Sequence, residues 1–346
     1  MAAQHRTGQP ALVCRGRRPR RLPRPSRRSE RGQRRGDHGR ALSHLDCPGR
    51  ARVRPRGGLT APDARPFRLQ SGVIAAELSG SPNGRLVVGI PGLSANLRSF
   101  DVIFEALDPD QFRRLAYDPR GRGRSEKTAP GTYGWPAHAR DVVEMADQVG
   151  AESFDLVGWS MGTWIAFVVC ALAPGRVRRL VLIDGGGEPD SSSVAPVHAG
   201  LERLGAIYPS RAAFFELAKR MPMYTPWPAW KRLFDYELED VEGGVRARTA
   251  KDAPWEDEAY RKSHDPYALW PAVTMPSLLV RAGREVLPGM GYILTASDAQ
   301  RFLRDVPQSK LVEVDSDHYA IGMHPETARA IADFLASPPT AGAPAR

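Results

Sequence analysis

The chain has 346 residues, 42% of them hydrophobic, and a net charge of +10, a composition that suits one large α/β domain with an insertion. Its longest apolar run, residues 164–173, is too short to span a bilayer, and no apolar signal core follows the basic N-terminal residues. The three cysteines and the histidines show no metal-ligand spacing. We therefore expect a soluble, cytoplasmic protein with no metal and no membrane contact.

The positive charge is concentrated in residues 1–60, which hold 17 arginines and three acids. This leader lacks apolar periodicity and cannot bury enough surface to offset the entropy of ordering, so we expect it to be disordered. Three further interpretations are open: a nucleic-acid or polyanion-binding arm, a transit peptide, and a translation start set too early. We favour the last over nucleic-acid binding, because GC-rich upstream DNA encodes sequence rich in Arg, Pro and Gly.

Short apolar runs then alternate with helical patterns. The predicted strands cover residues 67–69, 73–78, 85–90, 113–117, 154–157, 179–183, 277–282 and 310–314. The predicted helices cover residues 100–107, 136–149, 163–172 and 325–335. A turn at residues 81–84 predicts a hairpin that leads into the third strand. This alternation predicts an α/β fold with a mostly parallel central sheet and helices on both faces.

Residues 185–272 interrupt this pattern and contain no predicted strand. Their aromatic and Met residues fall in helical or Pro-broken stretches, which predicts an inserted helical cap. The core would then consist of residues 61–184 and 273–337, followed by a flexible tail at 338–346. The cap aromatics could pack onto the core or line an apolar substrate pocket, and packing is favoured for any single residue.

The stretch Gly158-Trp159-Ser160-Met161-Gly162 lies between a predicted strand and a predicted helix. A serine in such a tight turn adopts a strained backbone conformation, and only small residues fit two positions before and after it. Ser160 would lie at a helix N-terminus, where free N–H groups and the helix dipole favour a developing negative charge. The motif predicts a nucleophile that attacks a carbonyl carbon.

A serine nucleophile needs a base and a carboxylate that orients that base. His318 follows the last predicted strand and is our predicted base, with His324 as its rival. Glu285, at the end of the preceding strand, is our predicted acid, because the order Ser160, Glu285, His318 matches one hydrolase fold class. The alternative acids are Asp184, after the strand ending at residue 183, and Asp315 and Asp317, which lie too close in sequence to His318.

The tetrahedral intermediate of acyl transfer requires two backbone N–H donors. Met161 N–H, directly after the serine, is one candidate, and Leu93 N–H, in the turn after an early strand, is the other. Trp159 and Gly92 are the residues that we expect to contact the substrate.

Residues 66–337 resemble the α/β-hydrolase superfamily. The resemblance rests on the serine turn, the order of the motifs and the loop 118–125, whose sequence is DPRGRGRS and which is mainly structural in that family. This loop lacks the Gly-Lys-Ser/Thr ending of a phosphate-binding P-loop. Pro91-Gly92 replaces the usual His-Gly, and Glu285 replaces a more common Asp. The serine argues against the haloalkane dehalogenase and epoxide hydrolase branches, which use an aspartate.

We therefore expect a capped serine hydrolase that cleaves a small apolar ester or lactone through an acyl-enzyme on Ser160. This chemistry needs no cofactor, only the triad and water. A carbon–carbon bond hydrolase, a thioesterase or a cofactor-free perhydrolase would use the same triad, and a non-catalytic ligand-binding protein would keep the same fold. The sequence leaves the oligomeric state open.

Overall fold

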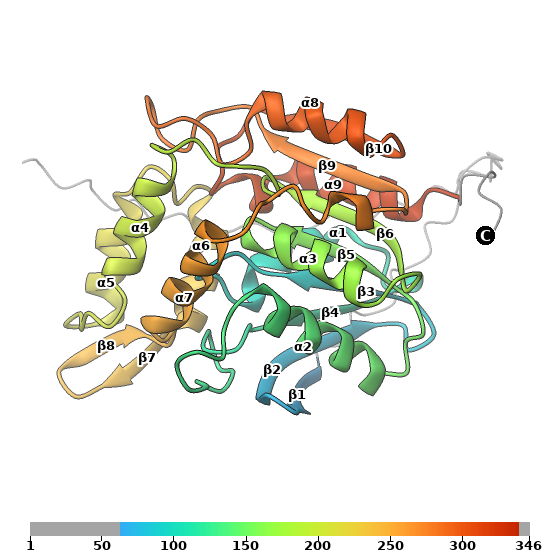
Figure 1. The fold of residues 1–346 in the computed structure, drawn as a ribbon. Helices are drawn as coiled ribbons and strands as arrows, with labels where there is room; N and C mark the ends of the chain where they lie inside the picture. The colour runs from blue at the N-terminus through green and yellow to red at the C-terminus, as the bar shows by residue number, and fades with distance from the viewer. Residues whose placement is uncertain (1–62, 339–346) are drawn as a thin grey trace, which may run out of the picture. The chain divides into compact units, whose positions relative to one another are not determined.

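A central sheet of eight strands organises residues 63–338, which are the residues that the computed structural model describes (Figure 1). The strand order is β1-β2-β4-β3-β5-β6-β9-β10. The strands are β1 Asp63–Leu69, β2 Gly72–Gly80, β3 Arg85–Ile90, β4 Phe112–Tyr117, β5 Phe154–Trp159, β6 Val177–Ile183, β9 Ser277–Ala282 and β10 Ser309–Val314. The pairs β1–β2 and β2–β4 are antiparallel and all other pairs are parallel, which confirms the predicted mostly parallel sheet. The predicted leader lies outside the described residues, as does the tail beyond residue 338.

The prediction of a hairpin between the second and third strands was wrong. The turn itself forms, since Gly84 N donates a hydrogen bond to Ser81 O at 3.0 Å. However, β4 lies between β2 and β3, and β3 pairs in parallel with β4 and β5. A turn motif reports only local geometry, whereas β3 is buried along most of its length and takes its partners from distant segments.

Helices cover both faces of the sheet. They are α1 Asp101–Ala106, α2 Trp135–Gln148, α3 Met161–Leu172, α8 Ala296–Asp305 and α9 Pro325–Ala336. Successive residues of a strand point to opposite faces of the sheet. Leu156 accordingly packs in the apolar cluster that includes α2 and α3 residues, and Val157 packs in the cluster that includes α1 and α9 residues. Helix α8 was not predicted, because its buried residues are only Asp298, Ala299 and Phe302 and its apolar signal is weak.

The insertion contains four helices and a small ribbon. They are α4 Val194–Glu202, α5 Arg211–Lys219, α6 Trp227–Glu237, β7 Leu238–Val241, β8 Gly244–Ala247 and α7 Asp252–Lys262, and Figure 1 shows them grouped at one end of the sheet. The expectation of no strand here was wrong, since β7 and β8 pair antiparallel. Only Leu238 and Val245 of this ribbon are buried, so its sequence lacks the apolar alternation of a core strand.

Three short 3-10 turns complete the fold: η1 Leu97–Phe100, η2 Trp270–Ala272 and η3 Ile321–Met323. No helix among residues 63–338 is long and apolar enough to cross a membrane.

Candidate active site

Ser160 occupies the single residue between the end of β5 and the start of α3. Its φ of 54° is in the left-handed region, which L-residues rarely adopt and which costs backbone energy. Hydrogen bonds hold this conformation from both sides: Ser160 N donates to Ile183 O at 2.9 Å, and the Thr163 hydroxyl donates to Ser160 O at 2.7 Å. The serine is therefore fixed by the adjacent strand and by the first turn of α3.

The two glycines of the motif are required by close backbone contacts. A Cβ on Gly158 would lie 2.4 Å from Gly162 O, and a Cβ on Gly162 would lie 2.0 Å from Ile90 O. Neither distance is compatible with a side chain, because the obstructing atoms belong to the backbone. The prediction that only small residues fit these positions is confirmed.

His318 lies against Ser160. Its Nε2 is 3.0 Å from Ser160 Oγ, within range for proton transfer from the hydroxyl. The imidazole is buried, and the loop behind it is fastened by Asp317, whose carboxylate accepts hydrogen bonds from the backbone N–H groups of Tyr319 and Ala320. The structure therefore brings together the predicted nucleophile and the predicted base.

Asp184 provides the carboxylate that contacts the histidine. Its Oδ2 accepts a hydrogen bond from His318 Nδ1 at 2.7 Å, and its Oδ1 accepts one from Ala282 N at 2.9 Å. Asp184 directly follows β6 and is 1% exposed. With a φ of 45°, it and Ser160 are the two non-glycine residues of positive φ among residues 63–338. Backbone strain thus coincides with two members of the proposed triad.

The prediction that Glu285 orients the histidine is wrong. Glu285 Oε2 accepts a hydrogen bond from Gly289 N at 2.7 Å, within its own loop. Strands β6 and β9 are neighbours, with Ile183 opposite Val280, so acids at either strand end lie at the same sheet edge. Sequence order alone cannot choose between these ends, and Asp184, the alternative, is the residue that reaches His318.

The remaining alternatives have other partners. His324 caps α9 by accepting a hydrogen bond from Glu326 N at 3.2 Å, and Asp315 pairs with Arg284 at 3.2 Å. Neither contacts Ser160.

The two candidate oxyanion donors flank the serine. Met161 begins α3, whose first N–H groups have no acceptor within the helix. Leu93 lines the same cavity as Ser160, and a Cβ on the adjacent Gly92 would lie only 3.4 Å from Ser160 Cβ. The assignment of these two N–H groups to an oxyanion hole stays a prediction.

A buried arginine fastens the Leu93 turn, which sequence reasoning did not anticipate. Arg122 Nε donates to Leu93 O at 3.0 Å, and its Nη2 pairs with Asp257 of α7 at 2.5 Å. Asp257 also lies 3.0 Å from His138 Nε2, and all three of these side chains are fully buried. Burial opposes ionisation of Asp257, but His138 and Arg122 together hold its pKa well below the usual range. The glycine-rich loop thus links the Leu93 turn to the cap.

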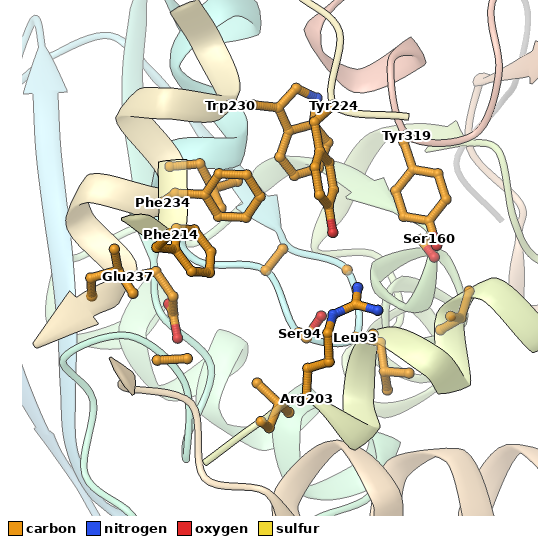
Figure 2. Close-up of a pocket in the computed structure, with 18 of the residues that line it drawn as sticks. Leu93, Ser94, Ser160, Arg203, Phe214, Tyr224, Trp230, Phe234, Glu237 and Tyr319 are labelled. Carbon is orange, nitrogen blue, oxygen red and sulfur yellow. The ribbon is translucent and has the colours of Figure 1, made fainter. Parts of the chain in front are cut away.

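Ser160 lines an apolar cavity (Figure 2). Its lining includes the aromatic residues Trp159, Tyr208, Phe214, Tyr224, Trp230, Phe234 and Tyr319. Gly92 and Trp159, the predicted contact residues, line it as well. Cap aromatics also pack onto the core, for example Trp230 against Tyr319 with ring centroids 6.4 Å apart. The two roles left open for the cap aromatics therefore coexist in the same residues.

A smaller cavity shares part of this lining. Ser160, Leu93 and Val197 line both spaces, and the smaller one continues toward Trp135 and Trp164. The nucleophile thus borders two cavities of unequal size.

Comparison with known proteins agrees with the fold. The family model for the alpha/beta hydrolase fold matches residues 85–217. A 2-(acetamidomethylene)succinate hydrolase of Mesorhizobium japonicum is 28% identical over 273 residues, which is 78% of this chain and 94% of that protein. A 3-hydroxybutyrate-oligomer hydrolase of Cupriavidus necator is 32% identical over 176 residues, which is 47% of this chain and 57% of that protein. For several curated relatives, the chain spans only about half of their length.

Among solved structures, an E-2-(acetamidomethylene)succinate hydrolase superimposes with a TM-score of 0.70 at 24% identity, over 80% of this chain and all of that one. At this identity the likeness concerns the fold. The chain therefore has the alpha/beta hydrolase fold, which is the fold of the superfamily that its motifs resemble.

Proposed function

We propose that the protein is a serine hydrolase that cleaves a carboxylic ester, a lactone or a related amide through an acyl-enzyme on Ser160. The observation that carries the proposal is the chain of hydrogen bonds from Ser160 through His318 to Asp184, at 3.0 and 2.7 Å. It combines a nucleophile, a base and an orienting carboxylate, the arrangement that activates a serine hydroxyl.

In the proposed reaction, His318 Nε2 takes the proton of Ser160 as Oγ attacks the carbonyl carbon. Asp184 holds the Nδ1–H tautomer and stabilises the imidazolium that forms. The N–H groups of Met161 and Leu93 receive the oxyanion. His318 then gives its proton to the leaving group, and a water molecule activated by the same imidazole hydrolyses the acyl-enzyme.

The relatives support the extension from esters to amides. One is named an N-formylmaleamate deformylase, from Pseudomonas putida, and is 26% identical over 242 residues, which is 83% of its length. The names of the two relatives described above refer to an acetamido compound and to 3-hydroxybutyrate oligomers. Esters and amides pass through the same kind of tetrahedral intermediate, so one triad can serve both.

A substrate panel tests the proposal. The full chain is assayed with matched p-nitrophenyl esters, lactones, anilides, thioesters and a vinylogous 1,5-diketone, beside Ser160→Ala. We expect turnover of an ester, a lactone or an amide that is lost in the variant. Exclusive cleavage of the diketone or the thioester would replace the proposal with a carbon–carbon hydrolase or a thioesterase. Ligand binding without turnover would favour a non-catalytic protein.

A further inference from the structure

The cavity lined by Ser160 is apolar except at a few positions, and one of these carries a cation. Arg203 is the C-cap residue of α4 and lines the same cavity as Ser160 and His318. Figure 2 shows its guanidinium extending from the helix into the cavity, below the hydroxyl of Tyr224. A positive charge thus faces the space in which the acyl compound would lie.

Arg203 forms no ion pair with a carboxylate among residues 63–338. Its neighbour Glu202 pairs with Lys251 instead, at 3.1 Å. Arg203 is an exposed residue, so its charge is not buried in the protein. An arginine beside aromatic walls and without a protein anion can accept an anion from a ligand.

Two tyrosines lie near this cation. Burial raises the pKa of Tyr224, and the Arg203 guanidinium opposes that rise. Burial also raises the pKa of Tyr319, with Tyr224 adding to the rise and Arg203 again opposing it. Both phenols therefore stay protonated and can donate hydrogen bonds. The two rings meet edge to face, with centroids 6.3 Å apart.

The acidic residue that lines this cavity, Glu237, is occupied elsewhere. Its oxygens accept hydrogen bonds from Asn96 Nδ2 at 3.0 Å and from the Thr249 hydroxyl at 2.6 Å. Burial raises the pKa of Glu237, which favours its neutral form. The carboxyl group of Glu237 thus does not neutralise Arg203.

On these observations, and resting on the proposed function, we propose that the substrate carries a carboxylate that Arg203 binds. The hydroxyls of Tyr224 and Tyr319 are placed to donate to the same anion, while Ser160 attacks the acyl carbon. A charge-assisted hydrogen bond from guanidinium to carboxylate is about twice as strong as a neutral one, and the aromatic walls reduce its screening. The substrate class is thus a short ester or amide that bears a free carboxylate.

Matched esters test this proposal. Phenyl hemisuccinate carries a carboxylate at the end of its acyl chain, and phenyl 4-methylpentanoate carries an isopropyl group at the same place. The pair 3-carboxyphenyl acetate and 3-isopropylphenyl acetate places the same difference on the leaving group. The value of kcat/KM is measured for the full chain and for Arg203→Gln, Arg203→Lys and Arg220→Gln. Arg220 is a suitable control, because it is an exposed C-cap arginine of α5 that does not line the cavity.

We expect the wild-type chain to prefer the carboxylate-bearing member of one pair at least tenfold. Arg203→Gln should lower kcat/KM for that ester about 10- to 100-fold, the effect of losing one hydrogen bond to a charged group, with little change for its neutral partner. Arg203→Lys should retain part of the preference, and Arg220→Gln all of it. The pair that responds shows whether the carboxylate belongs to the acyl part or to the leaving group.

Equal losses for the charged and neutral esters in Arg203→Gln, or no loss for either, would overturn the proposal. Labelling of Ser160 by a fluorophosphonate separates this failure from failure of the proposed function. If Ser160 is labelled and the esters are cleaved without a charge preference, only the carboxylate proposal falls. If Ser160 is not labelled and no ester is cleaved, both fall.

Discussion

The carboxylate of Asp184 and the imidazole of His318 meet at 2.7 Å although 134 residues separate them in the chain. The contact forms because β6 and β10 flank β9 in the sheet, so the loops that follow them leave the same edge. Ala282 N, at the end of β9, fixes the second carboxylate oxygen of Asp184. The acid is therefore held by the strand between it and the base.

Replacing Asp184 should reduce turnover far more than replacing Glu285. Asp184→Asn removes the acceptor that fixes the histidine tautomer, and we expect kcat to fall by about 10³–10⁴-fold, the usual effect of that change in a triad. Glu285→Gln should leave kcat within about twofold, because the Glu285 carboxylate accepts its hydrogen bond from Gly289 N in its own loop and not from His318. Steady-state kinetics on an activated ester checks both. The reverse ranking would restore Glu285 as the acid.

The N–H of Leu93 can be removed without removing the rest of the turn. Leu93→Pro should lower kcat by about 10²–10³-fold, the typical loss for one oxyanion donor. Leu93→Ala keeps the N–H and should cost less than about tenfold, mainly through lost packing. The measurement is kcat of both variants, at a temperature at which thermal unfolding shows both to be folded. Equal kcat values in the two variants would exclude Leu93 N–H from the oxyanion hole.

The close contact at Gly162 predicts a loss of stability. Gly162→Ala places a Cβ 2.0 Å from Ile90 O, so strand and helix must separate, at a cost of about 1–3 kcal/mol or more. Gly200→Ala is the matched control, because its Cβ meets only the Arg203 side chain at 3.9 Å within α4. We expect that change to stabilise the protein by about 0.5–1 kcal/mol. Thermal unfolding compares the two, and a Gly162→Ala protein as stable as wild type would contradict the contact.

The pair of Arg122 and Asp257 predicts a pH dependence of stability. The pKa of Asp257 is lowered in the folded chain, so the carboxylate stabilises the fold above its unfolded pKa of about 3.9. That contribution is lost as the pH falls below this value toward the folded pKa. Asp257→Asn leaves Arg122 buried without its partner and should cost about 3–5 kcal/mol at pH 7.

Thermal unfolding of wild type and Asp257→Asn between pH 7 and pH 3 measures this difference. The gap between the two proteins should narrow on acidification. A gap that is constant over this range would mean that Asp257 does not change its ionisation on unfolding.

The features predicted correctly from the sequence are those that a short segment determines. The turn at Ser160 is one, because its two glycines and the flanking apolar runs all lie within one strand, one turn and one helix. The strand ranges of the core are another, since β5 and β9 are mostly apolar and are buried throughout. His318 follows a strand, and its position could be inferred from that alone.

The features that were missed depend on neighbours in space. The choice between Asp184 and Glu285 needs the sheet order, which places β6 beside β9. The insertion of β4 between β2 and β3 likewise cannot be seen in a turn sequence. The positive φ of Asp184 cannot be predicted from the amino-acid sequence, because the residue is not a glycine. Its position directly after a buried strand can be predicted. The loop that contains Arg122 was predicted, but the ion pair of Arg122 was not, because its partner Asp257 is 135 residues away in the chain.

The central claim is that His318 and Asp184 activate Ser160, and the intact mass of the protein after fluorophosphonate treatment tests it most directly. We expect one adduct on the wild-type chain, none on Ser160→Ala, much slower labelling of Asp184→Asn and normal labelling of Glu285→Gln. An adduct that persists in Ser160→Ala, or a folded wild-type chain that is never labelled, would contradict the account.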